Sequence, residues 1–182
     1  MVEAYNRFES ENGFGLEKMG HLVFHLPYAF HGRRIISSIF LENFKKHHDI
    51  TSLEDEIGIE EGEDGFLRAL TKSATYKNFV ASKIAPNDKA SSEVGNMYTA
   101  SIFMALMSTL ASLSEDNAGD EIGFIAYGSG SKSKVFSAKL SNGFSEKASS
   151  WNLFGNLNNR EAITFNEYVS LHTGALDKPL RE

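Results

Sequence analysis

His25 is the side chain in this sequence that is best placed to do chemistry. It lies inside the apolar run 22–26, directly before Pro27. We expect the run to form a buried strand and Pro27 to open the first turn of a helix. Catalytic groups often occupy such strand ends in layered α/β folds, because the following helix N-terminus favours negative charge. From periodicity alone, a core histidine that is hydrogen-bonded to the backbone is the better interpretation.

Three histidines, His21, His25 and His31, raise the question of a metal site. The first two are four residues apart on the expected strand, which separates them by roughly 13 Å at about 3.3 Å per residue. That distance is too long for two ligands of one ion, so we expect no metal. The sequence also contains no cysteine, which excludes disulfides, thiolate metal sites and a cysteine nucleophile within this chain.

Two polar segments further along the chain each have a structural and a functional interpretation. Asn96 and Tyr98 stand at the start of an apolar segment, 96–113, where Asn96 is either a helix N-cap or a ligand-binding amide. The segment 128–130, Gly-Ser-Gly, follows an expected strand over 122–127. It forms either a hairpin turn or a tight turn whose backbone N–H groups face a substrate oxyanion. Its spacing matches neither the dinucleotide-binding nor the P-loop motif.

The densest basic group consists of Arg33, Arg34, Lys45 and Lys46. Such a group is usually the solvated face of a helix, but arginines there can also bind phosphates. The formal net charge of the chain is -6. This charge disfavours a nucleic-acid-binding protein, which needs a basic face, and leaves room for a local anion site.

The elements that position these residues follow from periodicity and turn signals. We expect helices over 2–11, 29–46, 66–82 and 96–113, and a last helix that starts with the capping-box pair Thr164 and Glu167. We expect strands over 22–26, 122–127 and 135–140, an acidic connection with at most a short helical turn over 49–65, and a turn over 85–88. This order indicates one mixed α/β layered domain over residues 1–182.

The stretch between Glu93 and Glu115 carries no charge and is long enough to cross a bilayer. It contains several serines besides Asn96 and Thr109, which suit a helix buried among protein elements better than one facing lipid. The first residues are charged and lack the apolar segment of a signal peptide. We therefore expect no membrane association and a cytoplasmic location.

Three segments together resemble the hydroxymethylglutaryl-CoA synthases of the thiolase-like superfamily. They read FHLPY over 24–28, VGNMYTAS over 94–101 and IGFIAYGSG over 122–130, and they occur in the order and at roughly the spacing of that family's C-terminal half. The resemblance covers residues 20–140 well and the last forty residues loosely. It implies the C-terminal half of a thiolase-like α-β-α-β-α fold, with a mixed sheet and a buried central helix.

The resemblance also implies an acyltransferase of the mevalonate pathway that condenses acetyl-CoA with acetoacetyl-CoA. In it, His25 would polarise the acetoacetyl group, and Asn96, Tyr98, Gly128 and Ser129 would contact the substrate. Arg33 and Arg34 would contact coenzyme A. The coenzyme A thioesters are substrates, and no separate cofactor is implied. The family's nucleophilic cysteine and its glutamate base belong to an N-terminal half, and its members are homodimers.

The sequence departs from the family pattern at Phe30, where many members carry a lysine, and at Ala126, where a serine is common. The first change affects the expected coenzyme A contacts. Two alternatives therefore stand beside the synthase. One is a non-catalytic thiolase-like module that binds acyl-CoA or a partner half. The other is a β-branching synthase that acts on an acyl-carrier protein.

Overall fold

The computed structural model describes residues 1–128, 130 and 132–176, and in this part of the chain the strands form one three-stranded mixed sheet. Strand β1 (Met19–Phe24) lies at one edge and pairs in parallel with β2 (Glu121–Gly128). Strand β3 (Lys132–Lys139) pairs antiparallel with β2, from Glu121 opposite Lys139 to Gly128 opposite Lys132. The expected hairpin is therefore confirmed, and β1 reaches β2 through the long helical crossover that a parallel pair requires.

Helices make up most of the remaining described chain. Their bounds are α1 (Val2–Asn12), α2 (His31–Ile35), α3 (Ser37–His47), α4 (Thr51–Ile57), α5 (Phe66–Leu70), α6 (Ala74–Lys83), α7 (Ala85–Val94), α8 (Ser101–Leu110), α9 (Phe144–Ser150), α10 (Leu153–Asn158) and α11 (Phe165–His172). Two 3-10 turns, Tyr98–Ala100 and Glu115–Asn117, lead into and follow α8.

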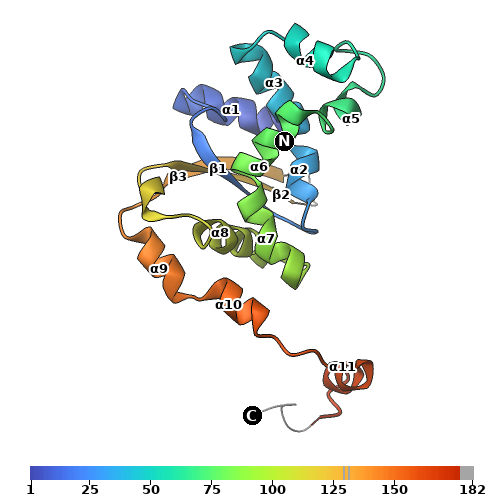
Figure 1. Cartoon of the computed structure of the whole chain (residues 1–182), viewed down its shortest axis with the longest axis vertical. Helices are drawn as coiled ribbons and strands as arrows, with labels where there is room; N and C mark the ends of the chain where they lie inside the picture. Colours follow the sequence, from blue (N-terminus) through green and yellow to red (C-terminus); the bar gives the residue numbers. More distant parts are fainter. Residues whose placement is uncertain (129, 131, 177–182) are drawn as a thin grey trace.

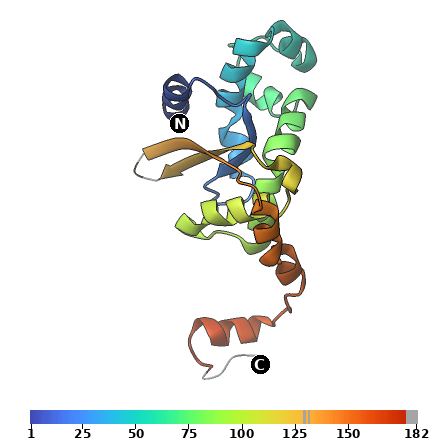
Figure 2. The ribbon, with the colours of Figure 1, turned by 90° about the vertical axis from the view of Figure 1, so that its left-hand side faces the viewer.

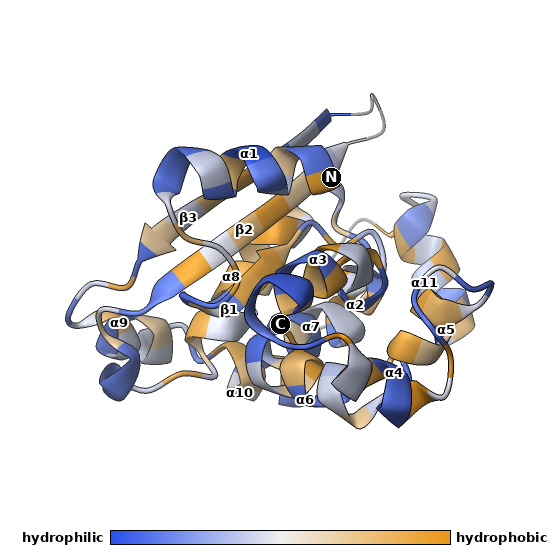
Figure 3. Ribbon diagram, turned by 90° about the horizontal axis from the view of Figure 1, so that it is seen from above, coloured by the Kyte–Doolittle hydropathy of each residue, from blue (hydrophilic) through white to orange (hydrophobic). Residues whose placement is uncertain are grey.

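The sheet is covered on both faces near β1. Helix α1 lies over one face, and α7 and α8 lie against the other (Figures 1 and 2). Leu22, Val23 and Phe24 of β1 are fully buried, as expected for a parallel strand with helices on both sides. Figure 3 shows the apolar residues of β1, β2 and α8 gathered in the middle of the molecule. The expected α/β layering is confirmed.

Several helix predictions need correction. The segment 29–46 is two helices, α2 and α3, and 66–82 is also divided, into α5 and α6. The predicted turn at 85–88 is wrong, because Pro86 lies in the first turn of α7, where its missing N–H removes no helical hydrogen bond. The acidic connection contains the seven-residue helix α4. The helix expected from 96 begins only at Ser101 as an α-helix.

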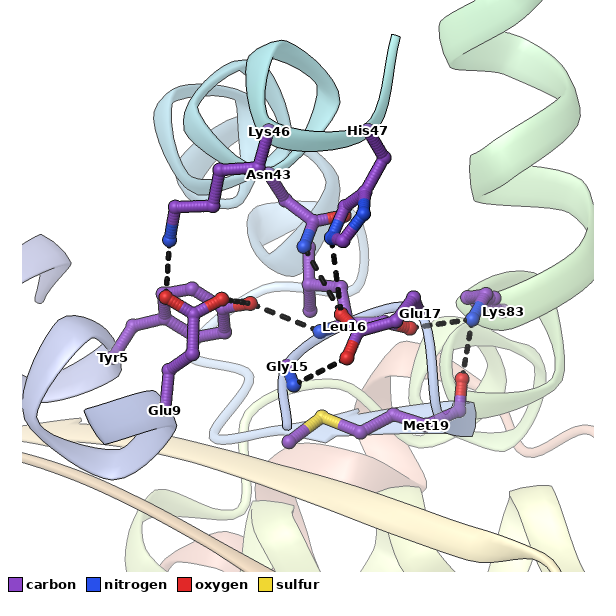
Figure 4. A network of polar contacts seen from close by, with 10 residues as sticks. All are labelled: Tyr5, Glu9, Gly15, Leu16, Glu17, Met19, Asn43, Lys46, His47 and Lys83. Carbon is purple, nitrogen blue, oxygen red and sulfur yellow. Dashed lines mark hydrogen bonds and ion pairs between the residues drawn. The ribbon is translucent and has the colours of Figure 1, made fainter. Parts of the chain in front are cut away.

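A polar network fixes the loop that leads into β1 (Figure 4). The Lys83 ammonium group donates to the carbonyl oxygens of Leu16 (2.6 Å) and Met19 (2.5 Å). The Tyr5 hydroxyl accepts a hydrogen bond from the amide of Leu16 (2.9 Å), and Glu17 accepts one from the amide of Gly15 (2.8 Å). These bonds satisfy backbone groups that the turn leaves without sheet partners.

The chain beyond β3 leaves the sheet, and α11 lies far from it (Figure 1). No residue of α11 is buried, and the capping box between Thr164 and Glu167 is confirmed. Before α11, Arg160 is bonded to α7 through its two terminal nitrogens, which donate to the Glu93 carbonyl (2.7 Å) and carboxylate (2.9 Å). Among the described residues, no helix is both long enough and apolar enough to span a bilayer.

Candidate functional site

The candidate site begins where β1 ends. His25 follows the last residue of this strand, and its amide still donates to the Ile125 carbonyl of β2 (3.3 Å). Strand β2 continues past this point, so Tyr127 lies beside the histidine. Their ring centroids are 5.5 Å apart in an edge-to-face arrangement at 74°. The His25 side chain is partly buried, which places it at the boundary between core and surface.

Ser101, the first residue of α8, contacts His25 from the face of the sheet that α7 and α8 cover. Its Oγ lies 2.8 Å from His25 Nδ1 and accepts a hydrogen bond from the amide of Leu26 (3.0 Å). The Ser101 side chain is buried, with a relative exposure of 1%. Ser101 thus joins the central helix to the histidine motif. No local signal in the sequence distinguishes this serine, although it ends the segment 94–101.

Aromatic rings surround the outer side of His25. The His31 ring centroid lies 4.6 Å from that of Tyr28 and 5.1 Å from that of Tyr127. Burial lowers the pKa of His31, and the nearby Arg34 and His25 lower it further. Burial also raises the pKa of Tyr127. Near neutral pH, His31 and Tyr127 are therefore both uncharged and can line a site without adding charge to it.

Asn96 and Tyr98 lie in the connection between α7 and α8. The Asn96 Oδ1 accepts a hydrogen bond from the amide of Tyr98 (2.8 Å), an Asx-type turn, and the residue does not cap α8. Tyr98 has a positive φ of 49° and is 79% exposed. A bulky residue in the left-handed region is strained and often marks a functional turn. This turn leads through Ala100 directly to Ser101.

Arg33 connects the site to a buried polar chain. Its Nε donates to Asp88 Oδ2 (2.5 Å), and Asn87 Nδ2 donates to the other oxygen, Asp88 Oδ1 (2.7 Å). Asn87 Oδ1 in turn accepts the amide of Phe24 (2.9 Å), the residue before His25. Burial raises the pKa of Asp88, while the bonds from Arg33 and Asn87 oppose that shift. Because the Asp88 carboxylate is buried, its desolvation offsets much of the attraction to Arg33, and the pair adds little net stability.

Arg33 and Arg34 also line a groove of about 1140 Å³ between α2, α5 and α6. Five basic and no acidic side chains line it, and its apolar part includes Phe30, Leu67, Tyr76 and Val80. The basic set is Arg33, Arg34, Arg68, Lys72 and Lys77. The Arg33 guanidinium lies 4.8 Å from the centroid of the Phe30 ring. The first two arginines stand out in the sequence, whereas Arg68 of α5, Lys77 of α6 and Lys72 in the turn between these helices follow more than thirty residues later.

The structure brings only part of the predicted site together. Gly128 is exposed and ends β2, one residue after Tyr127. Ser129, the expected contact to an acyl carbonyl, lies outside the described residues. Within the described part of the chain, no cluster of histidine, aspartate and glutamate side chains could hold a metal ion.

Comparisons with known proteins place this arrangement in a family. The hydroxymethylglutaryl-CoA synthase of Schizosaccharomyces pombe is 28% identical over 164 residues, which is 86% of this chain and 36% of that protein. Among solved structures, PksG, an HMG-CoA synthase from Bacillus subtilis, aligns with a TM-score of 0.70 at 18% identity, over 94% of this chain and 37% of that one. The HMG synthase of the curacin biosynthetic pathway, solved with holo donor-ACP, gives a TM-score of 0.66 at 19% identity, over 96% of this chain and 37% of that one.

The chain spans little more than a third of the length of these relatives. The structural likeness confirms the expected thiolase-like fold. The family model described as hydroxymethylglutaryl-coenzyme A synthase C terminal matches residues 2–174. With the three motifs of the sequence now located around one strand end, the chain belongs to the hydroxymethylglutaryl-CoA synthase family and corresponds to its C-terminal part.

Proposed function

We propose that this chain is the C-terminal part of a synthase that makes hydroxymethylglutaryl-CoA from acetyl-CoA and acetoacetyl-CoA. The acetyl group is first carried as a thioester on a cysteine. A glutamate removes a methyl proton, and the resulting carbanion adds to the acetoacetyl ketone. The ketone oxygen gains a proton, and water then cleaves the thioester to release the product. This chain has no cysteine, so the nucleophile belongs to an N-terminal half, and by resemblance to the family the glutamate base belongs there too.

The observation that carries the proposal is the setting of His25. It lies at the end of a buried strand, with Nδ1 bonded to Ser101, and its Nε2 has no hydrogen-bond partner within the described residues. A histidine held in this way can offer a proton to an oxygen that becomes negative during carbon–carbon bond formation. Asn96, Tyr98, Gly128 and Ser129 are proposed substrate contacts, by resemblance to the family.

Coenzyme A thioesters are the proposed substrates, and no separate cofactor is proposed. The groove beside α2 supports this, since a chain of net charge -6 concentrates five basic side chains there. Arg33 is already paired with Asp88, so Arg34 is the better candidate for a coenzyme phosphate. At position 30, Phe30 replaces the lysine of many relatives and offers an apolar face that is 53% exposed.

An N-terminal half is the proposed partner of the exposed apolar surface on α8 and β3. Phe103 of α8 is 64% exposed, and Phe136 of β3 is 46% exposed. Large exposed apolar patches often mark an interface between proteins. We propose that the N-terminal half covers them, and that the assembled cytoplasmic enzyme is a homodimer in the mevalonate pathway.

The direct test joins the chain to an N-terminal half that carries the cysteine and glutamate. The joined protein should convert acetyl-CoA and acetoacetyl-CoA to hydroxymethylglutaryl-CoA, measured by chromatography of the thioesters. The 182-residue chain alone should form no acyl-enzyme detectable by mass spectrometry and should bind a hydrophobic dye. No product from the joined protein, with both halves folded, would favour the non-catalytic acyl-CoA-binding module.

A second candidate is a β-branching synthase that acts on an acyl-carrier protein. The basic groove favours it equally, because carrier proteins present acidic residues around a phosphopantetheine arm, and the curacin relative was solved with such a partner. The two candidates differ in the acceptor. Replacing Arg68 and Lys72 by glutamine should raise the KM for whichever acceptor is native and leave kcat nearly unchanged, because both side chains lie away from His25. Comparing acetoacetyl-CoA with the acetoacetyl carrier protein identifies the acceptor.

A further inference from the structure

The backbone on both sides of His25 is held by side chains from two helices. Strand β1 is an edge strand, so the amides of Phe24 and Leu26 point away from β2 and need other acceptors. Asn87 of α7 accepts the first at 2.9 Å, and Ser101 of α8 accepts the second at 3.0 Å. Both acceptors are almost completely buried, at 0% and 1% exposure. The histidine is thus held in a fixed position between two helices.

The neighbours of the Ser101 hydroxyl determine whether it donates a hydrogen bond to His25 or accepts one from it. A hydroxyl has one proton to donate and two lone pairs, and the amide of Leu26 already occupies one lone pair. The remaining close contact within the described residues is His25 Nδ1, at 2.8 Å. If Nδ1 carried a proton, the hydroxyl proton would be buried without an acceptor, which is unfavourable. In the favoured arrangement, Ser101 therefore donates a hydrogen bond to an unprotonated Nδ1.

That arrangement determines the chemistry of the other ring nitrogen. A neutral imidazole with a bare Nδ1 carries its proton on Nε2 and can only donate there. We propose that Ser101 is a positioning residue that fixes His25 in the Nε2–H tautomer, so that the neutral ring acts as a hydrogen-bond donor and not as a base. The catalytic consequence rests on the proposed condensation, whereas the tautomer is a property of the chain itself.

A matched control exists on the same helix. Ser108 is also fully buried, accepts the amide of Ala90 (3.0 Å) and donates to the carbonyl of Pro86 (2.6 Å). Its hydroxyl therefore makes the same kinds of bonds as that of Ser101, without a histidine. Ser108→Ala should reproduce the packing and stability loss of Ser101→Ala and leave His25 unchanged. Ser101→Thr keeps the hydroxyl and serves as the conservative variant.

The first measurement uses the joined protein, labelled with ¹⁵N-histidine, and needs no activity. Long-range proton–nitrogen spectra near pH 8 should show Nδ1 of His25 as the unprotonated nitrogen, with His25→Gln providing the assignment. Ser101→Ala should increase the Nδ1–H population, while Ser101→Thr and Ser108→Ala should not. A protonated Nδ1 in the unmodified chain, or a tautomer ratio unaffected by Ser101→Ala, would overturn the assignment.

The second measurement uses the joined enzyme. Ser101→Ala should lower kcat for condensation on the order of tenfold to a hundredfold, the loss seen when a metal-binding histidine loses its orienting partner. Acetyl transfer to the cysteine should change little, and Ser101→Thr should restore most of the loss. If the spectra show the tautomer change but condensation is unaffected, the proposed role of His25 fails and the tautomer assignment stands. Equal losses for Ser101→Ala and Ser108→Ala would reduce Ser101 to a packing residue.

Discussion

The polar side chains at the two ends of strand β1 use their hydrogen-bonding groups differently. At its start, Lys83 donates to the carbonyls of Leu16 and Met19, and the Tyr5 hydroxyl binds the amide of Leu16, so the polar groups there are paired with backbone (Figure 4). At its end, buried Asn87 and Ser101 also pair with backbone amides, but His25 keeps one ring nitrogen without a partner among the described residues. At the start of the strand Lys83 and Tyr5 are bound to backbone, although His21 Nδ1 is buried there without a hydrogen-bond partner among the described residues, and at the end His25 keeps Nε2 for a ligand.

This difference separates a structural polar group from a functional one. Both ends contain partly buried ionisable side chains, so burial alone does not distinguish them. Lys83 uses its protons on backbone carbonyls, whereas the contacts of His25 orient its ring and leave its Nε2 edge unused.

The largest effect is expected from His25→Ala in the joined enzyme. Removing one donor from a developing oxyanion typically lowers the rate about a hundredfold to a thousandfold, or roughly 2.7–4 kcal/mol. The rate of condensation should fall by this factor. The rate of cysteine acetylation should change little, because that step depends on the N-terminal half. The measurement is a quenched assay of acetyl-enzyme beside product formation.

His21→Ala is the matched control for that experiment, because His21 is another partly buried histidine of the same region and lies near the other end of β1. It should leave both half-reactions intact. If His25→Ala instead lowers both half-reactions equally, together with the melting temperature, His25 is a core residue and the two ends of the strand are alike.

The next largest effect is expected from Lys83→Met, and it should appear in stability. Two carbonyls, those of Leu16 and Met19, lose their donor, and an unsatisfied buried group costs about 1–3 kcal/mol. Urea unfolding should show a loss of about 2 kcal/mol or more, with kcat per folded molecule unchanged. Lys134→Met, at an exposed position on β3, is the control. A loss no larger than that of the control would show that the network at the start of β1 is dispensable.

The smallest effect concerns pH. Burial lowers the pKa of His21, with Lys83 adding to the shift and Asp120 opposing it. The unfolded chain therefore binds this proton more readily, and the free energy of unfolding should fall as the pH drops below the ordinary histidine pKa of 6.5. The pKa of His31, near the other end of β1, is also lowered by burial. His21→Gln should reduce the acid slope of stability, measured by denaturant titration between pH 7 and 5. An unchanged slope would mean that His31 or other groups dominate.

The sequence predicted the elements with strong local signals. The apolar run before Pro27 identified β1, the glycine-rich turn identified the β2–β3 hairpin, and the Thr164–Glu167 pair identified the start of α11. The helix breaks at Ile36 and at 71–73 were not predicted. The close approach of α2 to β1 was not predicted either: Gly32 lies so near Phe24 that a Cβ there would be 2.8 Å from the ring. No local pattern reveals such an approach.

For the candidate site, the sequence predicted His25 and the segment around Asn96, but not the residues that join them. Ser101 and Asn87 were missed because serine and asparagine are common surface residues. Their role depends on α7 and α8 meeting the unpaired edge of β1. The basic groove was missed for a similar reason, since Arg68 and Lys72 read as solvated helix positions until α5 and α6 pack beside α2.

The bond between Arg160 and Glu93 has a consequence for the shape of the protein in solution. The two side chains are 48% and 57% exposed, so dissolved ions compete directly with their pairing. This pair ties the segment before α11 to α7, while α11 itself buries none of its residues. The direction in which α11 extends, and with it the radius of gyration of the chain, should therefore depend on ionic strength even while the sheet and its histidine remain unchanged.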